Sequence, residues 1–593
     1  SLSIIVLFGS YLGQLEKDTR SDAFLVDDNP ALIYREKVKA LFGLSDPFVI
    51  AVVSEQSIFT PEALNLVRIV SELAADVNNI DPDGIKSLAT ENNIVGTQDG
   101  MEVDPFFEGE LTHQGQADHV RDSIRDFPLY QGSMVAQDES ATLVIAELLD
   151  EAQAEQTYLD IERALATIEV PEGLRLHVAG EGAISGYLGS YISADAQRLN
   201  PLAALVITLI VFTAFLRGGP TLAANLIIAA SALVTLGAMA AFGVSFYVIT
   251  NALPVILIGI SVADSIHIYS EYFERRTHFP GETFNESIVS SLEAMWRPVT
   301  LTTLTTAAGF LGLYFAAYMP PFKFFGVFTA LGVCVAWLYS LVFLPAVMSL
   351  LKTEVRPYLA NKLRSDQQQD LSMKVMVVLG DFTFKRARAV VTVALVVGVI
   401  GIFSASQLVV DEDRIETFHK SEPLFQANKV INDRFDGSNY LDIVVETHAE
   451  EGIFEPAVLR KMEALQRYAE TLPNVQGSNS VVDYLKQMNR ALNEGDPEQY
   501  RIAESRDLIA QYFLLYSASS EPTDFEEEVD YDYRLANVRV ILNSGAYANN
   551  KVVVEAMDKY LLETFNDKTV TAALSGRVNL TYHWIKDLGG SHF

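Results

Sequence analysis

The apolar run 246–269 constrains the fold of this chain more than any other feature of its sequence. It is long enough to cross a bilayer as a helix, which takes about 20 residues at about 1.5 Å each. In lipid the backbone must satisfy its own hydrogen bonds, so a segment of this kind excludes an ordinary soluble fold. The run nevertheless contains Asp264 and His267. Ionisable groups inside a membrane are costly, and by default they mark an ion path or a proton relay.

Further apolar runs accompany this one. The sequence predicts membrane helices at 199–216, 221–243, 246–269, 299–318, 323–351 and 389–406. The first apolar stretch, 1–12, is too short to span, and we interpret it as the remnant of a first membrane helix. The turns between the helices of 199–351 are too short to hold a domain, so we expect these five helices to pack as neighbours.

Charge and hydropathy occupy different parts of the chain. The sequence is 49% hydrophobic yet carries a formal net charge of −33, and its acidic residues crowd into the segments outside the apolar runs. A strongly acidic surface argues against nucleic acid as a partner. The predicted organisation is a remnant at 1–12, a first soluble domain at 13–198, a five-helix bundle at 199–351, a linker at 352–388, a seventh membrane helix at 389–406 and a second soluble domain at 407–593.

Basic residues predict the orientation in the membrane. Lys and Arg gather in the linker 352–388, in a loop expected at 271–297 and at Arg217, while the turns at 242–245 and 318–321 have none. The positive-inside rule therefore places the three basic connections in the cytoplasm. Both acidic domains then lie together on the opposite, outer side.

The two soluble domains share an order of landmarks that indicates an internal duplication. The first copy has Pro30, a strand-like run 47–54 and Pro61 at a helix start, and the second repeats them as Pro423, 440–447 and Pro456. Proline suits the first position of a helix, where its missing N–H costs nothing. Each copy predicts strand, helix, strand and then strand, helix, strand again, which suits a ferredoxin-like sandwich.

The duplication leads to two further expectations. The segment 92–137 between the halves of the first domain should be a long excursion outside the core. A second bundle of membrane helices should follow residue 593, because in the first copy the domain leads directly into such a bundle.

Three segments carry a resemblance to a known family. They are the run beginning at Gly259 (GISVADSIH), the run 297–306 (RPVTLTTLTT) and the run 343–346 (FLPA). Together with the duplicated halves, they resemble the resistance–nodulation–division (RND) superfamily of exporters. The most similar branch is the MmpL-like, sterol-sensing-domain branch, which includes hopanoid exporters and relatives of Patched and Dispatched.

The resemblance implies a multi-pass α-helical protein of the bacterial inner membrane, with two α+β ferredoxin-like periplasmic domains and an RND-type internal duplication. It also implies a secondary transporter, driven by an ion gradient, that exports a hydrophobic or lipid-like molecule. Asp264 stands beside Ser265, where Patched-like members carry a paired acid, and this leaves the coupling ion open between proton and sodium. Two alternatives stay open: a sterol-sensing, Patched-like receptor and a secretion accessory of the SecD/SecF kind.

The sequence contains no phosphate-binding glycine loop, zinc-ligand cluster or nucleophile elbow. We therefore expect a protein that is not an enzyme and has no cofactor and no bound metal. The expected partners are the hydrophobic molecule, a proton or sodium ion and membrane lipids. A homo-oligomer is left open.

Asp264 is the residue we expect to bind and release the driving ion. His267 follows it by three residues, which places both on one helical face, and Ser265 is adjacent, so both are expected to assist it. Hydroxyl groups of Ser261, Thr302 and Thr305 are candidates for the ion path. The alternatives are that Asp264 only anchors a neighbouring helix and that the threonines bond back to their own backbone.

Overall fold

The computed structural model describes residues 2–20, 22–97, 100–352, 354–355, 371–408, 411, 413–519 and 525–591. The chain forms two compact units. We call residues 1–18 with 192–410 the membrane unit, and residues 19–191 with 411–593 the soluble unit. Residues 353 and 356–370 of the predicted linker lie outside the described residues.

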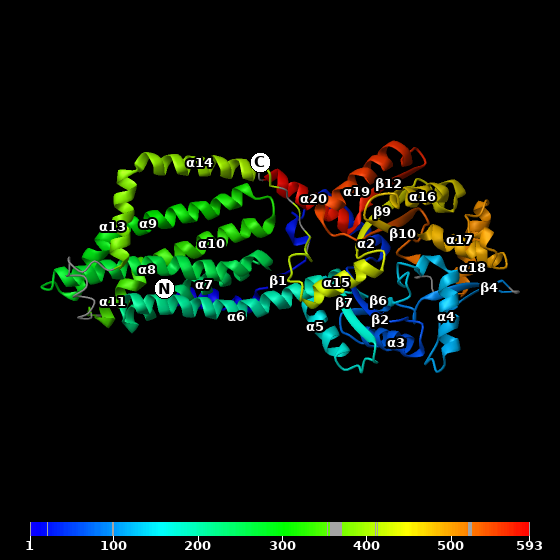
Figure 1. Cartoon of the computed structure of the whole chain (residues 1–593), viewed down its shortest axis with the longest axis horizontal. Helices are drawn as coiled ribbons and strands as arrows, with labels where there is room; N and C mark the ends of the chain where they lie inside the picture. Colours follow the sequence, from blue (N-terminus) through cyan, green and yellow to red (C-terminus); the bar gives the residue numbers. More distant parts are fainter. Residues whose placement is uncertain are drawn as a thin grey trace. The chain divides into compact units, whose positions relative to one another are not determined.

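The membrane unit consists mainly of helices (Figure 1). They are α1 (Leu2–Gly9), α6 (Glu181–Phe215, in this unit from Ile192 on), α7 (Gly218–Ala241), α8 (Ala252–His278), α9 (Phe284–Ala316), α10 (Pro320–Leu338), α11 (Leu344–Leu351), α13 (Leu371–Lys385) and α14 (Ala387–Ala405). Among the described residues, six helical segments are long and apolar enough to cross a membrane, and each overlaps one of the six predicted runs. The chain is therefore a multi-pass membrane protein.

Two details of these helices differ from the prediction. The loop expected at 271–297 is wrong, because α8 continues to His278 and α9 begins at Phe284. Thr283 and Glu286 cap the start of α9 reciprocally, with the Thr283 N–H donating to the Glu286 carboxylate at 2.8 Å. The run 246–269 also does not begin as a helix, since β8 (Phe246–Tyr247) pairs in parallel with β1 (Lys17–Asp18).

The soluble unit contains two four-stranded antiparallel sheets of the same design. The first is built from β2 (Phe48–Ser54), β3 (Ile80–Lys86), β6 (Ala141–Leu148) and β7 (Leu174–Ala179), in the order β3-β6-β2-β7. The second is built from β9 (Asn439–Thr447), β10 (Val475–Ser480), β11 (Leu535–Leu542) and β12 (Val570–Ser575), in the order β10-β11-β9-β12. Because β2 corresponds to β9 and β6 to β11, both copies follow one topology.

Helices complete each copy in the predicted sequence order. In the first copy α3 (Pro61–Ala75) joins β2 to β3, and α5 (Ala154–Leu165) joins β6 to β7. In the second, α16 (Pro456–Ala469) and α19 (Tyr547–Tyr560) take the same places. The Thr60 side chain caps α3 by accepting from the Ala63 N–H at 3.2 Å. After the last strand, α6 and α20 (Gly576–Ser591) begin at matching positions.

One helix of each copy packs on the sheet of the other copy. The leading helix α15 (Pro423–Arg434) of the second copy packs its Ala427 and Ile431 onto the first sheet, beside Val49 and Leu143. In return, α2 (Pro30–Phe42) of the first copy packs its Val38 and Phe42 against Val444 and Leu535 of the second sheet. A sheet face without such a cover would expose its apolar side chains, so each copy needs the other for its core.

The prediction that the segment 92–137 is an excursion outside the core is wrong. The segment forms a hairpin of β4 (Asn92–Thr97) and β5 (Gly100–Pro105), followed by α4 (Gln114–Asp126). Its buried apolar side chains join the main core of the unit: Ile94, Val103, Phe106, Leu111, Val120 and Ile124. The hairpin also packs on α17 (Val481–Leu492) of the second copy, where the Gln487 side chain donates to the Ile94 carbonyl at 3.2 Å.

Candidate functional site

The site in the membrane unit is built around α8, which packs against α7, α9 and α10. Its buried side chains include apolar residues that join two separate clusters, one containing Leu253 and Leu257 and one containing Ile258 and Val262. Among them, between Ile258 and Ile268, α8 also buries three polar residues, Ser261, Asp264 and Ser265. We call these three residues the polar face of α8.

A close crossing of three helices fixes the position of α8 one turn before Ser261. Gly332 of α10 lies so near that a Cβ atom there would stand 2.6 Å from Leu257 of α8 and 2.7 Å from the Thr235 hydroxyl of α7. The Ser231 hydroxyl of α7 donates to the Gly332 carbonyl at 2.7 Å. Small residues allow this approach in membranes, where close packing and interhelical hydrogen bonds hold helices together.

Asp264 is the central residue of the polar face. It is 7% exposed, and its carboxylate has no hydrogen bond or ion pair with any residue that the structure describes. The hydroxyls of Ser261 and Ser265 are buried and also lack a hydrogen-bond partner among the described residues. Buried polar groups almost always have a partner, so this face has free capacity for a proton, an ion or water.

The unpartnered hydroxyls extend beyond these residues. Ser261, Ser265 and Tyr269 succeed one another at four-residue spacing and therefore lie on one face of α8. The Tyr269 hydroxyl is also buried, and within the part of the chain that the structure describes it has no hydrogen-bond partner. Ser340, in a π-helical turn after α10, has the same character. The sequence analysis did not single out Tyr269 or Ser340. Tyr269 follows Ser265 by four residues, and this spacing could have placed it on the same helical face from the sequence alone.

His267 does not share the environment of Asp264. It is exposed on the surface of the membrane unit, whereas Asp264 is buried. A spacing of three residues turns the helix by about 300°, so the edge of a buried face can fall between them. The structure therefore brings together Ser261, Asp264 and Ser265, and it separates His267 from them.

The two candidate threonines of α9 point away from the buried interior. Thr302 and Thr305 are exposed, and their hydroxyls donate to backbone carbonyls of their own helix at 2.8–3.1 Å. The threonines that face the bundle are Thr303, which is buried, and Thr300, whose hydroxyl accepts from the Trp337 indole at 2.9 Å. Periodicity alone did not distinguish these two faces.

No group of three or more His, Cys, Asp or Glu residues that could hold a metal ion occurs within the described ranges. The chemistry available to the polar face is therefore that of one carboxyl group and neighbouring hydroxyls. Such a set can exchange a proton or hold a small monovalent cation.

The sequence profile of the MMPL family matches residues 60–393, which include all of α8 and its polar face. The chain belongs to the MMPL family. The predicted membership of the RND exporter superfamily is thereby confirmed. Members of the MMPL family are membrane transporters and not enzymes. A comparison with curated proteins found no match.

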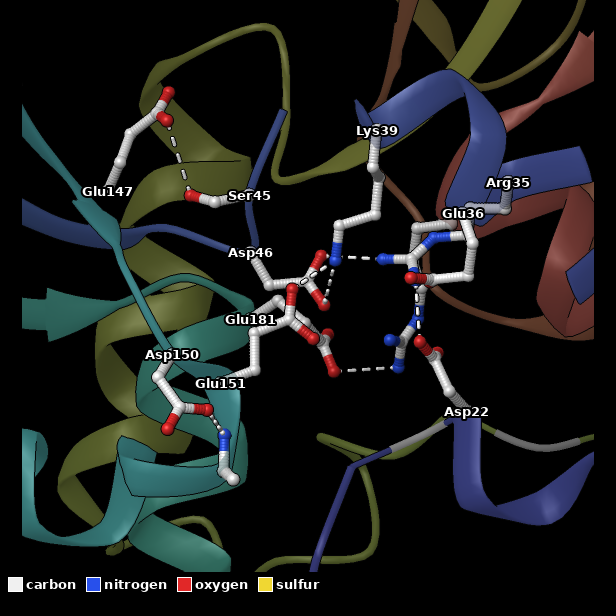
Figure 2. A network of polar contacts seen from close by, with 12 residues as sticks. Asp22, Arg35, Glu36, Lys39, Ser45, Asp46, Glu147, Asp150, Glu151 and Glu181 are labelled. Carbon is white, nitrogen blue, oxygen red and sulfur yellow. Dashed lines mark hydrogen bonds and ion pairs between the residues drawn. The ribbon is translucent and has the colours of Figure 1, made fainter. Parts of the chain in front are cut away.

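The soluble unit of this MMPL protein holds a buried ion-pair network (Figure 2). Arg35 of α2 is 4% exposed and donates to Asp22 at 2.6 Å and to Asp46 at 2.7 Å. Lys39, one turn along α2, pairs with Glu151 and lies 4.0 Å from Asp46. Burial alone would raise the pKa of Asp46, but Arg35 and Lys39 hold this pKa well below its usual range.

A second pairing joins the two copies of the MMPL soluble unit at equivalent places. Glu181 and Arg577 each follow the glycine after the last strand of their sheet. The Arg577 guanidinium lies 2.7 Å from the Glu181 carboxylate, and Arg414 lies 2.6 Å from the same oxygen. The cavity of about 160 Å3 at this place is lined by Glu181, Arg414 and Arg577 and, from the network of Figure 2, by Arg35, Lys39 and Asp46.

Proposed function

We propose that this MMPL protein is a secondary transporter in which Asp264 binds and releases the driving ion, most simply a proton. The observation that carries the proposal is the state of Asp264: a buried carboxylate, inside a membrane span, without a partner among the described residues. Keeping such a group costs stability, and structural anchoring does not explain it, because an anchor needs a partner. An ion that binds and leaves accounts for both facts.

The neighbouring hydroxyls support a path to Asp264. Ser261 and Ser265 flank it on the buried side of α8, and their unpartnered hydroxyls can bond water or an ion along the helix. The proposed role of His267 in assisting Asp264 is confined to the exposed surface of the helix, where its side chain lies. Proton binding neutralises Asp264 and so changes which packing of α7, α8 and α10 is favoured, which is how an ion gradient can drive alternating states.

The proposed substrate is a hydrophobic or lipid-like molecule, exported across the bacterial inner membrane. The strand order of both sheets supports ferredoxin-like domains, and the distribution of Lys and Arg supports placing both on the periplasmic side. In this arrangement the ion moves through the membrane unit and the substrate passes the soluble unit.

The test uses the full chain in proteoliposomes that contain a pH-sensitive dye. After an external acid pulse, the lumen should acidify faster than in protein-free liposomes, and Asp264→Asn should return the rate to the protein-free level. Glu274→Gln is the matched control, because Glu274 is an exposed carboxylate on the same helix. Full proton flux in Asp264→Asn, at equal reconstitution, would show that the relay is wrong.

Further outcomes separate the alternatives. A flux that follows a sodium gradient at constant pH and is lost in Asp264→Asn would identify sodium as the coupling ion. Saturable lipid binding without any gradient-dependent flux would instead favour the sterol-sensing receptor.

A further inference from the structure

Helix α6 belongs to both units of the chain as one continuous helix. It begins at Glu181 in the soluble unit and ends at Phe215 in the membrane unit. At its end, the ring centre of Phe215 lies 5.8 Å from that of Tyr269 and 5.4 Å from that of Phe273, both on α8. Tyr269 follows Asp264 on α8 by five residues. A change in the packing of α8 at Asp264 therefore acts on a helix that continues into the soluble unit.

Both copies of the soluble unit pass from the last strand into the next helix through a tight glycine joint. Gly180 directly precedes α6 with a φ of 89°, and a Cβ atom there would stand 2.5 Å from the Pro47 carbonyl oxygen. Gly576, at the start of α20, has a φ of 79°, and a Cβ atom there would stand 2.7 Å from the Asp442 nitrogen. Only glycine suits a positive φ at such close approach. The first turn of each helix is therefore held closely against its own sheet.

The residues after the two glycines carry opposite charges and contact each other. Nη2 of Arg577 lies 2.7 Å from Oε1 of Glu181, and the two side chains are only 15% and 17% exposed. When equivalent positions of two copies meet, they do so at the axis that relates the copies. Two glutamates at this place would repel each other. The arginine of the second copy replaces that repulsion with an ion pair between α6 and α20.

The charge of Arg577 does not suit its own helix. A helix N-terminus carries a partial positive charge, which favours anions and disfavours cations. Arg577 is the second residue of α20, whereas Glu181 is the first residue of α6. The Glu181 carboxylate therefore stabilises its own helix and also offsets the unfavourable arginine of the other. Departures from a local rule are expected where a residue serves a function beyond its own element.

Glu181 also contacts the segment through which the chain returns to the soluble unit. That segment starts at Asp411, and Nη1 of Arg414 lies 2.6 Å from the same oxygen of Glu181. Nη2 of Arg414 donates to the carbonyl of Thr19, the first residue of the soluble unit, at 3.4 Å. The Thr19 hydroxyl in turn donates to the Ser185 carbonyl of α6 at 2.9 Å. The segments that enter the soluble unit and the starts of α6 and α20 therefore gather around one carboxylate.

We propose that Glu181 is a positioning residue that links ion binding at Asp264 to both copies of the soluble unit. A displacement of α8 acts on α6 through Tyr269 and Phe215, and the pair of Glu181 with Arg577 passes it on to α20. This inference rests on the proposed function, because it takes the ion at Asp264 as the trigger. It adds that the two copies respond together.

Trp584 provides the reporter for this link. It lies on α20, is 5% exposed, and stacks on Phe24 of the first copy at 5.5 Å between ring centres. A movement of α20 relative to the first copy changes this stacking and with it the tryptophan emission. Replacing Trp296 and Trp337 by phenylalanine in all proteins leaves Trp584 as the single tryptophan of the chain.

The test compares Trp584 emission with and without Asp264→Asn, which makes this side chain neutral as proton binding does. The full chain is held in phosphatidylcholine nanodiscs at a single alkaline pH, so that no other group changes its charge. We expect Asp264→Asn to shift the emission of the otherwise unaltered chain. The shift should be lost in Glu181→Gln and in Arg577→Gln, whereas Arg577→Lys, which keeps the charge, should preserve it.

Glu55→Gln is the matched control. It breaks the pair of Glu55 with Arg175, which lies within the first copy at 2.8 Å, and the shift should persist. A role of Glu181 confined to holding the fold makes a different prediction: Glu181→Gln would lower stability, but Asp264→Asn would still shift the emission. A shift that persists in Glu181→Gln and in Arg577→Gln would therefore overturn the proposal, and so would the absence of a shift in the unaltered chain. If Glu181→Gln does not fold, the comparison of Arg577→Gln with Arg577→Lys decides.

Proton flux separates this link from the proposed function. Glu181→Gln should keep the flux of the unaltered chain after an external acid pulse, because Glu181 lies outside the membrane unit. A flux as low as that of Asp264→Asn would contradict the link, since Glu181 would then act on the ion path itself. An emission shift that depends on Glu181, without any proton flux in the unaltered chain, would support the link and reject the transport function.

Discussion

Replacing Arg35 with methionine removes the cation at the centre of the buried network in the soluble unit. The arginine is 4% exposed and contacts Asp22 at 2.6 Å and Asp46 at 2.7 Å. Methionine fills much of the same space without charge. The substitution therefore leaves the half-buried Asp46 with a weaker neutralising charge.

The expected loss can be bounded from the remaining contacts. Breaking one side of a buried ion pair costs about 3–5 kcal/mol. Lys39 stays within 4.0 Å of Asp46 and continues to neutralise part of its charge, which favours the lower end. We expect Arg35→Met to lower the free energy of unfolding by about 3 kcal/mol at pH 7. Adding Asp46→Asn should recover about 1–2 kcal/mol of this, because the unpaired charge is then gone.

The pH dependence has a definite sign. In the unaltered chain the pKa of Asp46 lies below its usual range, so its contribution is complete above the unfolded pKa of about 4 and is lost as the pH falls below it. In Arg35→Met fewer positive charges offset the effect of burial on the pKa of Asp46. The ionised form of Asp46 is therefore favoured less than in the unaltered chain. The stability difference between the two proteins should therefore shrink as the pH falls from 7 to about 4.

The assay follows urea unfolding of the full chain in detergent by tryptophan fluorescence. Trp296 and Trp337 are replaced by phenylalanine in all proteins, so that Trp584 of the soluble unit remains as the reporter. Trp584 is 5% exposed and stacks on Phe24 at 5.5 Å between ring centres, so unfolding changes its surroundings.

Arg460→Met is the matched control. Arg460 pairs with Glu504 on the surface, where the two side chains are 52% and 70% exposed, and such pairs contribute less than about 1 kcal/mol. A loss in Arg35→Met no greater than in this control would refute the reasoning. So would a double variant with Asp46→Asn that is as unstable as the sum of its parts.

Three further predictions follow from packing and from the polar face of α8. Phe42→Ala, at a fully buried residue of the exchanged helix α2, should destabilise the soluble unit by about 3–5 kcal/mol in the same urea assay, whereas Ile33→Ala on the exposed side of α2 should cost little. Gly332→Leu should lower the melting temperature of the membrane unit, because its side chain would overlap the neighbouring helices; an unchanged melting curve would contradict the close crossing. Ser265→Ala should slow proton flux several-fold without changing the melting curve, while Thr305→Ala, at an exposed hydroxyl, should not; equal rates in both would argue against a path along α8.

Some features of the structure could be predicted because they depend on neighbouring residues in the chain. The membrane helices are one example, since a continuous apolar run must satisfy its backbone locally wherever it lies. The helix start at Pro61 and the alternation of strands and helices are others. The capped start of α9 was available too: Thr283 followed three residues later by Glu286 is a capping box, and this signal was overlooked in the predicted loop.

Predictions about faces were less successful because a face is defined by what packs against it. Asp264 and His267 are three residues apart, yet one is buried and the other exposed. Thr302 and Thr305 lie on the outer side of α9, although the same stripe contains the buried Thr303. The position of the buried arc depends on which helices pack against α8 and α9, and periodicity does not contain that information.

The sequence by itself determined the membrane spans, the repeated α+β design and the unusual acid at Asp264, because length, apolar content and turn residues act locally. Only the tertiary structure decided that α2 and α15 exchange places and that Glu181 and Arg577, far apart in the chain, form an ion pair. The physical reason is that a side chain is buried by residues from distant parts of the chain as well as by its neighbours. Whether a polar side chain has a partner depends on residues that only folding brings near it.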